Sequence, residues 1–182
     1  MPGDHYVSGN GVIISTILGS CVSVCLYDPV NRVVAMNHFL LSGRRGDRSL
    51  PLCLTEAGRY GVNAMELIIN GMLRLGAEKR NFHAKVFGGA SLFSRDSGAD
   101  NSNCVGEVNS RFVIEFLQDE GIKLVASDLG GYEGRVIRFH SSDFSVYQRK
   151  IKKTAAPDII AREKLFRERE AAKQYAEPEL WG

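Results

Sequence analysis

Residues 12–41, VIISTILGSCVSVCLYDPVNRVVAMNHFLL, decide the fold because they contain three strand-like runs joined by turn residues. Val12–Thr16 is apolar and rich in β-branched side chains, which favour strands. Residues 22–27 alternate apolar side chains with smaller or polar ones, at the period of two that a strand with two unlike faces shows. An Asp-Pro pair then marks a turn, and Val33–Leu41 supplies the partner strand of a predicted hairpin.

The remainder of the chain predicts two core helices and further strands. One helix begins after Thr55, a suitable N-cap, and ends at Gly76, with apolar residues at helical spacing between them. Polar stretches predict loops at Ser42–Asp47 and Ser94–Asn103. The other expected elements are a helix at Ser110–Glu120 and strands at Ala84–Phe87, Ile122–Ser127, Gly134–His140 and Ser145–Gln148. This order predicts a layered α/β (α+β) domain with mixed sheets.

The C-terminal part has a different composition. From Pro157 to Tyr175 it is dense in charge and helix-prone, with only a narrow apolar stripe. We therefore divide the chain into a domain at 1–150 and a charged helical tail at 151–182. Charged helices are usually solvated, so we expect the tail to lie on the domain surface, with partner docking as the alternative.

The composition excludes several classes of protein. Of 182 residues, 44% are hydrophobic and 24% are charged, which is typical of a globular chain, and the net charge of +2 is too small to argue for nucleic acid. No apolar run approaches the length of a membrane span, and no leader pattern begins the chain. We expect a cytoplasmic protein that does not insert into the membrane.

The four cysteines do not form a metal-binding pattern. Cys21, Cys25, Cys53 and Cys104 make no Cys-x-x-Cys pair and have no zinc-site spacing with histidines, so neither a metal nor an organic cofactor is expected. In a cytoplasmic chain they would remain thiols. Cys25 lies inside a strand pattern and is typical of a small core residue.

Cys21 stands apart because it follows Gly19-Ser20 at the junction of two strand-like runs. Glycine there lets the backbone turn, and peptide N–H groups in such a turn can converge on an anion. A thiol at this junction is expected to face a cleft. The sequence therefore indicates Cys21 as a candidate nucleophile, with the backbone near Gly19 and Ser20 as its oxyanion support.

His38 is the candidate base for this thiol, since the thiolate is the attacking species. If the hairpin turn is centred near Val30, Cys21 lies opposite residue 38 or 39 of the next strand. We expect the Cys21 sulfur and a His38 ring nitrogen within hydrogen-bond reach. Structural roles for both residues remain the alternative, because buried cysteines and strand histidines are common.

The other motifs indicate backbone geometry. Phe87-Gly88-Gly89-Ala90 is a strand followed by a glycine turn without a phosphate-loop Lys-Ser/Thr, and residues 128–131, DLGG, form a turn signature. We expect both to shape the surroundings of a site. The remaining histidines lie near a terminus or at strand ends and are expected to be structural or at the surface.

In these segments the chain resembles CheD, the chemoreceptor glutamine deamidase family of bacterial chemotaxis. The resemblance covers roughly residues 6 to 149, in order. The matching segments are LGSCV at 18–22, Asp28-Pro29, MNHF at 36–39, RYG at 59–61, KVFGGA at 85–90 and DLGG at 128–131 with Gly134-Arg135. The family's fold, similar to the catalytic domain of cytotoxic necrotising factor toxins, implies a central mixed β-sandwich flanked by helices.

The resemblance also implies the site and the reaction. Cys21 corresponds to the family's nucleophile and His38 to its histidine, in the hydrolysis of receptor glutamine side chains to glutamate. The third position, usually a threonine six residues before the cysteine, is Ser15 here, with Thr16 beside it. We favour Ser15, because an even number of residues separates it from Cys21 along the strand. Asn37 is a further candidate for supporting the oxyanion.

Chemotaxis receptors are the protein substrate that the resemblance implies, with the CheC phosphatase as a further partner. Three alternatives remain from the sequence. The first is a non-catalytic regulator that binds CheC. The second is a redox-sensing thiol protein. The third is a receptor methylesterase that uses the same acyl-enzyme chemistry.

Overall fold

The computed structural model describes residues 1–9, 11–41, 56–91, 103–151 and 156–174. The expected loop at Ser42–Asp47 and the N-cap Thr55 lie outside these residues, as does most of the expected loop at Ser94–Asn103. In the described part of the chain, no helix is long and apolar enough to cross a membrane.

In the described ranges, eight strands and three α-helices are arranged as a mixed α/β structure with two sheets. In chain order the elements are β1 (His5–Ser8), β2 (Ile13–Leu18), β3 (Val22–Asp28), β4 (Val33–Asn37), α1 (Glu56–Arg74), the 3₁₀ turn η2 (Lys79–Asn81), β5 (His83–Gly88), α2 (Asn103–Asp119), β6 (Lys123–Leu129), β7 (Arg135–His140), β8 (Val146–Lys150) and α3 (Ala156–Gln174).

The two sheets have different strand orders. The larger sheet has the order β1-β4-β3-β5-β6, in which only β5 and β6 are parallel and are connected through α2. A parallel pair needs such a crossover connection. The smaller sheet is antiparallel, with the order β2-β7-β8. The chain therefore passes from the smaller sheet into the larger one between β2 and β3.

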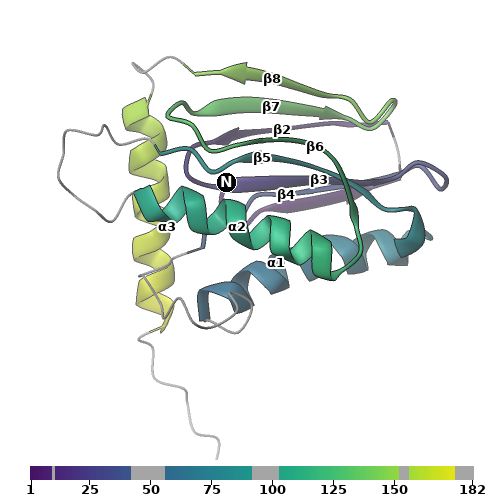
Figure 1. Ribbon diagram of the computed structural model, residues 1–182, viewed down its shortest axis with the longest axis horizontal. Coiled ribbons are helices and arrows are strands. Elements are labelled where there is room, and N and C mark those ends of the chain that lie inside the picture. Colours follow the sequence, from purple (N-terminus) through teal and green to yellow (C-terminus); the bar gives the residue numbers. More distant parts are fainter. Residues whose placement is uncertain (10, 42–55, 92–102, 152–155, 175–182) are drawn as a thin grey trace, which may run out of the picture.

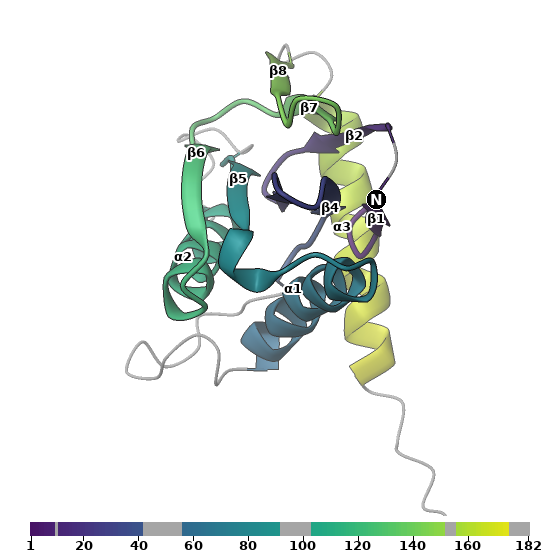
Figure 2. The ribbon, with the colours of Figure 1, turned by 90° about the vertical axis from the view of Figure 1, so that its right-hand side faces the viewer.

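These elements form three layers. Helices α1 and α2 cover one face of the larger sheet, and the smaller sheet covers the other (Figures 1 and 2). One core lies between the larger sheet and the helices and contains Phe39, Met65 and Phe112. A second lies between the sheets and contains Leu18, Ile137 and Phe139. Each such side chain, when fully buried, contributes about 1.5–3 kcal/mol of transfer free energy.

The predicted hairpin is confirmed. Strands β3 and β4 pair antiparallel with Cys25 opposite Met36, and the turn between them is held by the Asp28 carboxylate, which accepts the Val30 and Asn31 amides at 2.8 and 2.9 Å. The strands expected after residue 84 are also present as β5 to β8, and the tail helix is present as α3.

Two elements differ from the expectation. The sequence analysis assigned no strand to His5–Ser8, which forms β1 at the edge of the larger sheet beside β4. Helix α2 begins at Asn103, seven residues before the predicted start at Ser110. The added turns include Gly106, whose missing side chain lets α2 pack directly on the backbone of Gly89.

A first prediction concerns this close approach. A Cβ on Gly106 would lie 2.4 Å from the Gly89 carbonyl oxygen. We expect Gly106→Ala to lower the free energy of unfolding by about 1–3 kcal/mol, although alanine is the better helix former. Urea denaturation measures this change. Gln118→Ala, on the exposed face of the same helix, should stay within about 0.5 kcal/mol of the wild type; an equally stable Gly106→Ala would contradict the packing.

Candidate active site

The turn from Gly19 to Cys21 connects the two sheets, and neighbouring segments hold it through hydrogen bonds to its backbone carbonyl groups. The Gly89 amide donates to the Cys21 carbonyl and the Ala90 amide donates to the Gly19 carbonyl, both at 2.7 Å. From α2, the buried Asn109 side chain donates to the Ser20 carbonyl at 2.9 Å. The thiol is therefore held by a turn whose carbonyl groups all have partners.

The glycines after β5 are required for this arrangement. Gly88 has φ +120°, and a Cβ there would lie 2.1 Å from the Cys21 carbonyl oxygen. Gly89 has φ +67°, in the left-handed region that favours glycine. The Gly88 carbonyl in turn accepts the Gly130 amide of the DLGG turn at 2.9 Å. The prediction that both glycine motifs supply backbone geometry around the site is confirmed.

A buried arginine, Arg135 at the start of β7, holds the DLGG turn. Its guanidinium donates to the Asp128 and Gly130 carbonyls and pairs with the Asp128 carboxylate at 3.1 Å. Burial lowers the pKa of Arg135 from its usual value, although Asp128 acts in the opposite direction. The turn, and through Gly130 the nucleophile segment, is thus supported from the smaller sheet.

Cys21 and His38 lie on the same face of the larger sheet. An isolated antiparallel bridge pairs Val22 with Phe39, so the same register places residue 38 opposite residue 23, two residues from Cys21. Residues two apart on a strand share a face, so the two side chains are diagonal neighbours that point toward the smaller sheet. The sequence had placed them directly opposite each other; the register differs from that expectation by one or two positions.

Asn37 points to the other face, toward α1. Its amide accepts from the Val24 amide at 3.0 Å and donates to the Ala64 carbonyl at 3.1 Å. The suggested role of Asn37 in supporting an oxyanion is therefore wrong in its geometry. Neighbouring residues of a strand face opposite ways, and Asn37 does not line the pocket that contains Cys21 and His38.

The structure corrects the choice between Ser15 and Thr16. Thr16 Oγ1 lies 2.9 Å from His38 Nδ1, in a hydrogen bond, whereas the Ser15 hydroxyl donates to the Ile137 carbonyl. In β2 the even-numbered residues face the larger sheet. The preference for Ser15 rested on strand parity with Cys21, but the turn at Gly19 and Ser20 interrupts the strand and resets that parity.

The His38 imidazole is held neutral. Its pKa is lowered to about 3, chiefly by burial and also by the positive N-terminal amino group of Met1, against the opposing effect of Asp4. Its backbone bonds to Gly3 and Asp4 fix the ring beside the pocket. Within the described residues, Nε2 is buried and has no hydrogen-bond partner, so one ring nitrogen is free while the other contacts Thr16.

Cys21 is covered, which differs from the expected thiol open to a cleft. Only 1% of the residue is exposed. Burial raises the pKa of the Cys21 thiol well above its usual value, and the neighbouring Glu163 carboxylate raises it further by its charge and by a hydrogen bond. Among the described residues the expected hydrogen bond to His38 is not made, since His38 Nε2 has no partner; the carboxylate beside Cys21 is that of Glu163, which accepts the Cys21 amide.

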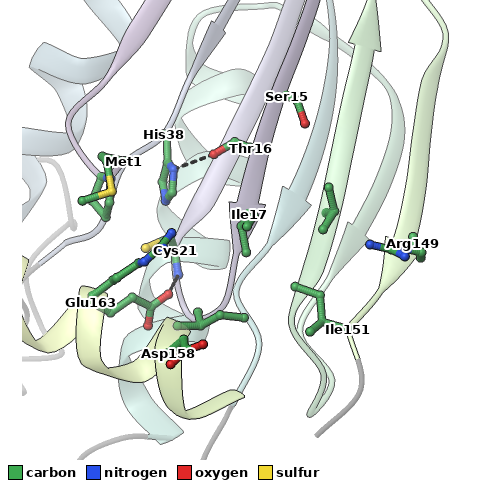
Figure 3. A pocket seen from close by; sticks show the side chains of 14 residues that line it. Met1, Ser15, Thr16, Ile17, Cys21, His38, Arg149, Ile151, Asp158 and Glu163 are labelled. Carbon is green, nitrogen blue, oxygen red and sulfur yellow. Dashed lines mark hydrogen bonds between the residues drawn. The ribbon is translucent and has the colours of Figure 1, made fainter. Parts of the chain in front are cut away.

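Glu163 on α3 is the residue that the sequence did not reveal. One carboxylate oxygen accepts the Cys21 amide at 3.2 Å and the other accepts the Ser20 hydroxyl at 2.5 Å. Figure 3 shows its side chain pointing from the helix to Cys21. Nothing distinguished it from the other acidic residues of the tail, except that Ile159 and Phe166 lie four and three residues away on the same helical face.

These residues line one pocket of about 480 Å³ at the end of the sheets (Figure 3). Its walls come from β2, the Cys21 turn, His38 and α3. In the described ranges no group of three or more His, Cys, Asp or Glu side chains is arranged to hold a metal ion. The arrangement offers a thiol, an imidazole with one free nitrogen, and an amide and a hydroxyl that already hold a carboxylate.

Comparison with known proteins decides the family. The model of the family described as CheD chemotactic sensory transduction matches residues 52–150, which are 99 of the 182 residues. The chain belongs to the CheD family. This confirms the resemblance found in the sequence.

Three relatives of this CheD family member carry the name probable chemoreceptor glutamine deamidase. A protein of Geobacter sulfurreducens is 54% identical over 151 residues, 83% of this chain and 75% of its own length. One of Shewanella oneidensis is 47% identical over 149 residues, 81% and 73% of the two chains. One of Methylobacillus flagellatus is 37% identical over 177 residues, 97% and 84% of the two chains. The last alignment leaves out at most five (182 − 177) residues, so it extends over Cys21 and His38.

A second prediction follows from the pKa of His38. The folded protein binds this proton only near pH 3, whereas the unfolded chain binds it near the ordinary value of 6.5. The contribution of neutral His38 to stability is therefore complete above pH 6.5 and is lost as the pH falls toward 3. Between pH 7.5 and 4.5, the wild type should lose about 2 kcal/mol more unfolding free energy than His38→Gln.

Urea denaturation at the two pH values measures this difference. His5→Gln, at an exposed position of β1, is the matched control and should lose as much stability as the wild type. Equal losses in the wild type and His38→Gln would contradict the buried, neutral imidazole.

Proposed function

We propose that this chain deamidates glutamine side chains of methyl-accepting chemotaxis receptors to glutamate, with Cys21 as nucleophile and His38 as base. The observation that carries the proposal is the placement of the Cys21 thiol, the His38 imidazole and the Thr16 hydroxyl around one pocket. The names of the CheD relatives supply the substrate, since each is described as a chemoreceptor glutamine deamidase.

The Thr16 hydroxyl selects the tautomer of the His38 imidazole that can act as a base. If Nδ1–H donates to Thr16 Oγ1, the lone pair of Nε2 is free to accept a proton. Nε2 is the nitrogen that is buried without a hydrogen-bond partner in the described structure. Cys21 lines the same pocket as His38, and movement of its side chain to this nitrogen lets His38 take the thiol proton.

The reaction is an acyl transfer. The Cys21 thiolate attacks the carbon of the glutamine carboxamide, and the carbonyl oxygen becomes an oxyanion. The Cys21 amide and the Ser20 hydroxyl are the donors for that oxyanion, since both already bond to carboxylate oxygens. The C–N bond breaks and ammonia leaves with the proton held by His38. Water, deprotonated by His38, hydrolyses the thioester to glutamate and restores the thiol.

The predicted domain division, fold similarity and cellular location also belong to this proposal. We take residues 1–150 as the catalytic unit and 151–182 as an appendage to it. The similarity of the sandwich to the catalytic domain of cytotoxic necrotising factor toxins and the cytoplasmic location stay predictions. No metal or organic cofactor takes part in any step described above.

A surface for a protein partner is available on the smaller sheet. Its outer face exposes Ile13, Ile17 and Tyr147, and exposed apolar patches are typical of protein-binding surfaces. We assign this face to the CheC phosphatase, the partner implied by the resemblance. A purely regulatory protein would bind CheC through it and leave receptor glutamines unchanged.

A third prediction tests the nucleophile. Cys21→Ala removes the sulfur that forms the thioester, so receptor cytoplasmic fragments should keep their glutamines, while the wild type adds about one dalton per converted glutamine. Mass spectrometry of the fragments measures this. Cys25→Ala is the control: its buried thiol lies in the sheet core, so it should lower stability by about 1 kcal/mol and spare the activity. Deamidation by Cys21→Ala at the wild-type rate would reject the assignment.

A fourth prediction tests the third residue. Thr16→Val keeps the shape but loses the hydroxyl on His38 Nδ1, so kcat/KM should fall by about 10- to 1000-fold through loss of the correct tautomer. Ser15→Ala should retain activity within about threefold, because its hydroxyl bonds to a strand carbonyl. The same receptor assay measures both variants, and the reverse order of effects would restore Ser15 to the role.

A further inference from the structure

Helix α3 places one of its side chains, that of Glu163, in the candidate active site of the same chain. It runs crosswise to the strands at one end of the layers, beside the turn that carries Cys21 (Figures 1 and 2). Most of its described surface is exposed, but Glu163 is only 6% exposed. A buried carboxylate is costly unless it is hydrogen-bonded, so its presence at this point of a charged helix needs an explanation.

The partners of Glu163 are the groups that the proposed reaction uses. Its two oxygens accept the Cys21 amide and the Ser20 hydroxyl, the donors assigned to the oxyanion. Glutamate is the product of glutamine deamidation, with the same side-chain length as the substrate. Glu163 thus has the side chain of the reaction product and makes the contacts that a bound product would make.

Two apolar anchors seat the helix on either side of Glu163. The Ile159 side chain packs over Gly134, where a Cβ would lie 3.0 Å from its methyl group, and Phe166 packs beside Gly3 and Tyr60. Residues 159, 163 and 166 follow the i, i+4, i+7 spacing of one helical face. The seat is therefore shaped for a helix whose central side chain enters the site.

The seated helix keeps the catalytic pair apart. Glu163 accepts the Cys21 amide beside the thiol, and the pKa of Cys21 is raised by burial and by that carboxylate. His38 Nε2 remains without a partner among the described residues. In the described part of the chain no cation forms an ion pair with Glu163, so hydrogen bonds alone offset the cost of burying its charge. An occupant held in this way can be displaced.

We propose that α3 is an internal occupant of the substrate site, in which Glu163 stands in the place of the product glutamate side chain. The inference rests on the proposed function and adds a control to it: a receptor glutamine enters only when α3 leaves. A carboxylate is not an acyl donor, so the occupant is not consumed. The apparent affinity for substrate is lowered by the fraction of molecules whose site is occupied.

Steady-state deamidation of receptor fragments by the full chain tests this competition. Glu163→Ala should lower KM by about fivefold or more with kcat retained, because the open fraction rises. Glu168→Ala removes an exposed carboxylate of the same helix and is the matched control, with unchanged constants. A fall in kcat on Glu163→Ala would make Glu163 a working catalytic group and overturn the proposal.

Alkylation of Cys21 by iodoacetamide gives a readout that does not depend on deamidation. The limiting rate at high pH reports access to the sulfur, and the pH midpoint reports thiolate formation. We expect Glu163→Ala to raise the limiting rate and lower the midpoint, because the covering side chain and its charge are both removed. Deamidation by the wild type with neither KM nor the limiting rate changed in Glu163→Ala would overturn this proposal alone. Absence of deamidation in every form would overturn the proposed function.

Glu163→Gln also turns the occupant into a substrate. Attack by Cys21 on the carboxamide that this substitution introduces would release ammonia, and hydrolysis of the thioester would return glutamate, a gain of about one dalton at this position. Peptide mass spectrometry should find glutamate at position 163 in this variant and glutamine in the Glu163→Gln, Cys21→Ala double variant. Conversion in both forms would show that Cys21 is not responsible and would count against the proposal.

Discussion

The turn from Gly19 to Cys21 is the constraint on which the rest of the structure depends. Within three residues the chain leaves the smaller sheet and enters the larger one, and the carbonyl groups of the turn are held by the amides of Gly89 and Ala90. That clamp requires glycine at 88 and 89, since a side chain at Gly88 would collide with the Cys21 carbonyl. Because carbonyl groups are occupied on one side, the Cys21 amide is left to face the pocket, where it binds an anion. One turn thus places the proposed nucleophile beside a backbone amide that binds a carboxylate.

The two sheets contribute different residues to the site. The larger sheet places Cys21 and His38 on one face, and the smaller sheet brings Thr16 to the imidazole across the core between them. Burial keeps His38 neutral and keeps Cys21 protonated while α3 is in place. In the described state the Cys21 thiol is protonated and the His38 imidazole is neutral, which is the starting state of the proposed thiol mechanism.

The sequence was most informative where a local pattern determines geometry. Strand alternation and the Asp-Pro turn predicted the hairpin, and the hairpin brought His38 to the face that carries Cys21. The alternation of side chains along a strand gave the wrong choice at Ser15, because the turn between Ser15 and Cys21 is irregular. The same alternation, applied to Asn37 and His38, would have excluded Asn37 from the site. The start of α2 was misplaced by seven residues, and the missed turns contain Gly106, which packs closely on another backbone. The contact between Glu163 and Cys21 joins residues 142 positions apart, and no local pattern predicts such a contact.

The measurement that tests the central claim most directly is the capture of the acyl-enzyme. A receptor cytoplasmic fragment is mixed with the full chain, quenched in acid within a turnover, digested, and searched by mass spectrometry for a joined peptide. The account predicts a thioester between Cys21 and a receptor glutamine residue, with the mass of both peptides less one ammonia and sensitive to hydroxylamine. Turnover of receptor glutamines with the adduct on another residue, or with no adduct under any quench time, would contradict it.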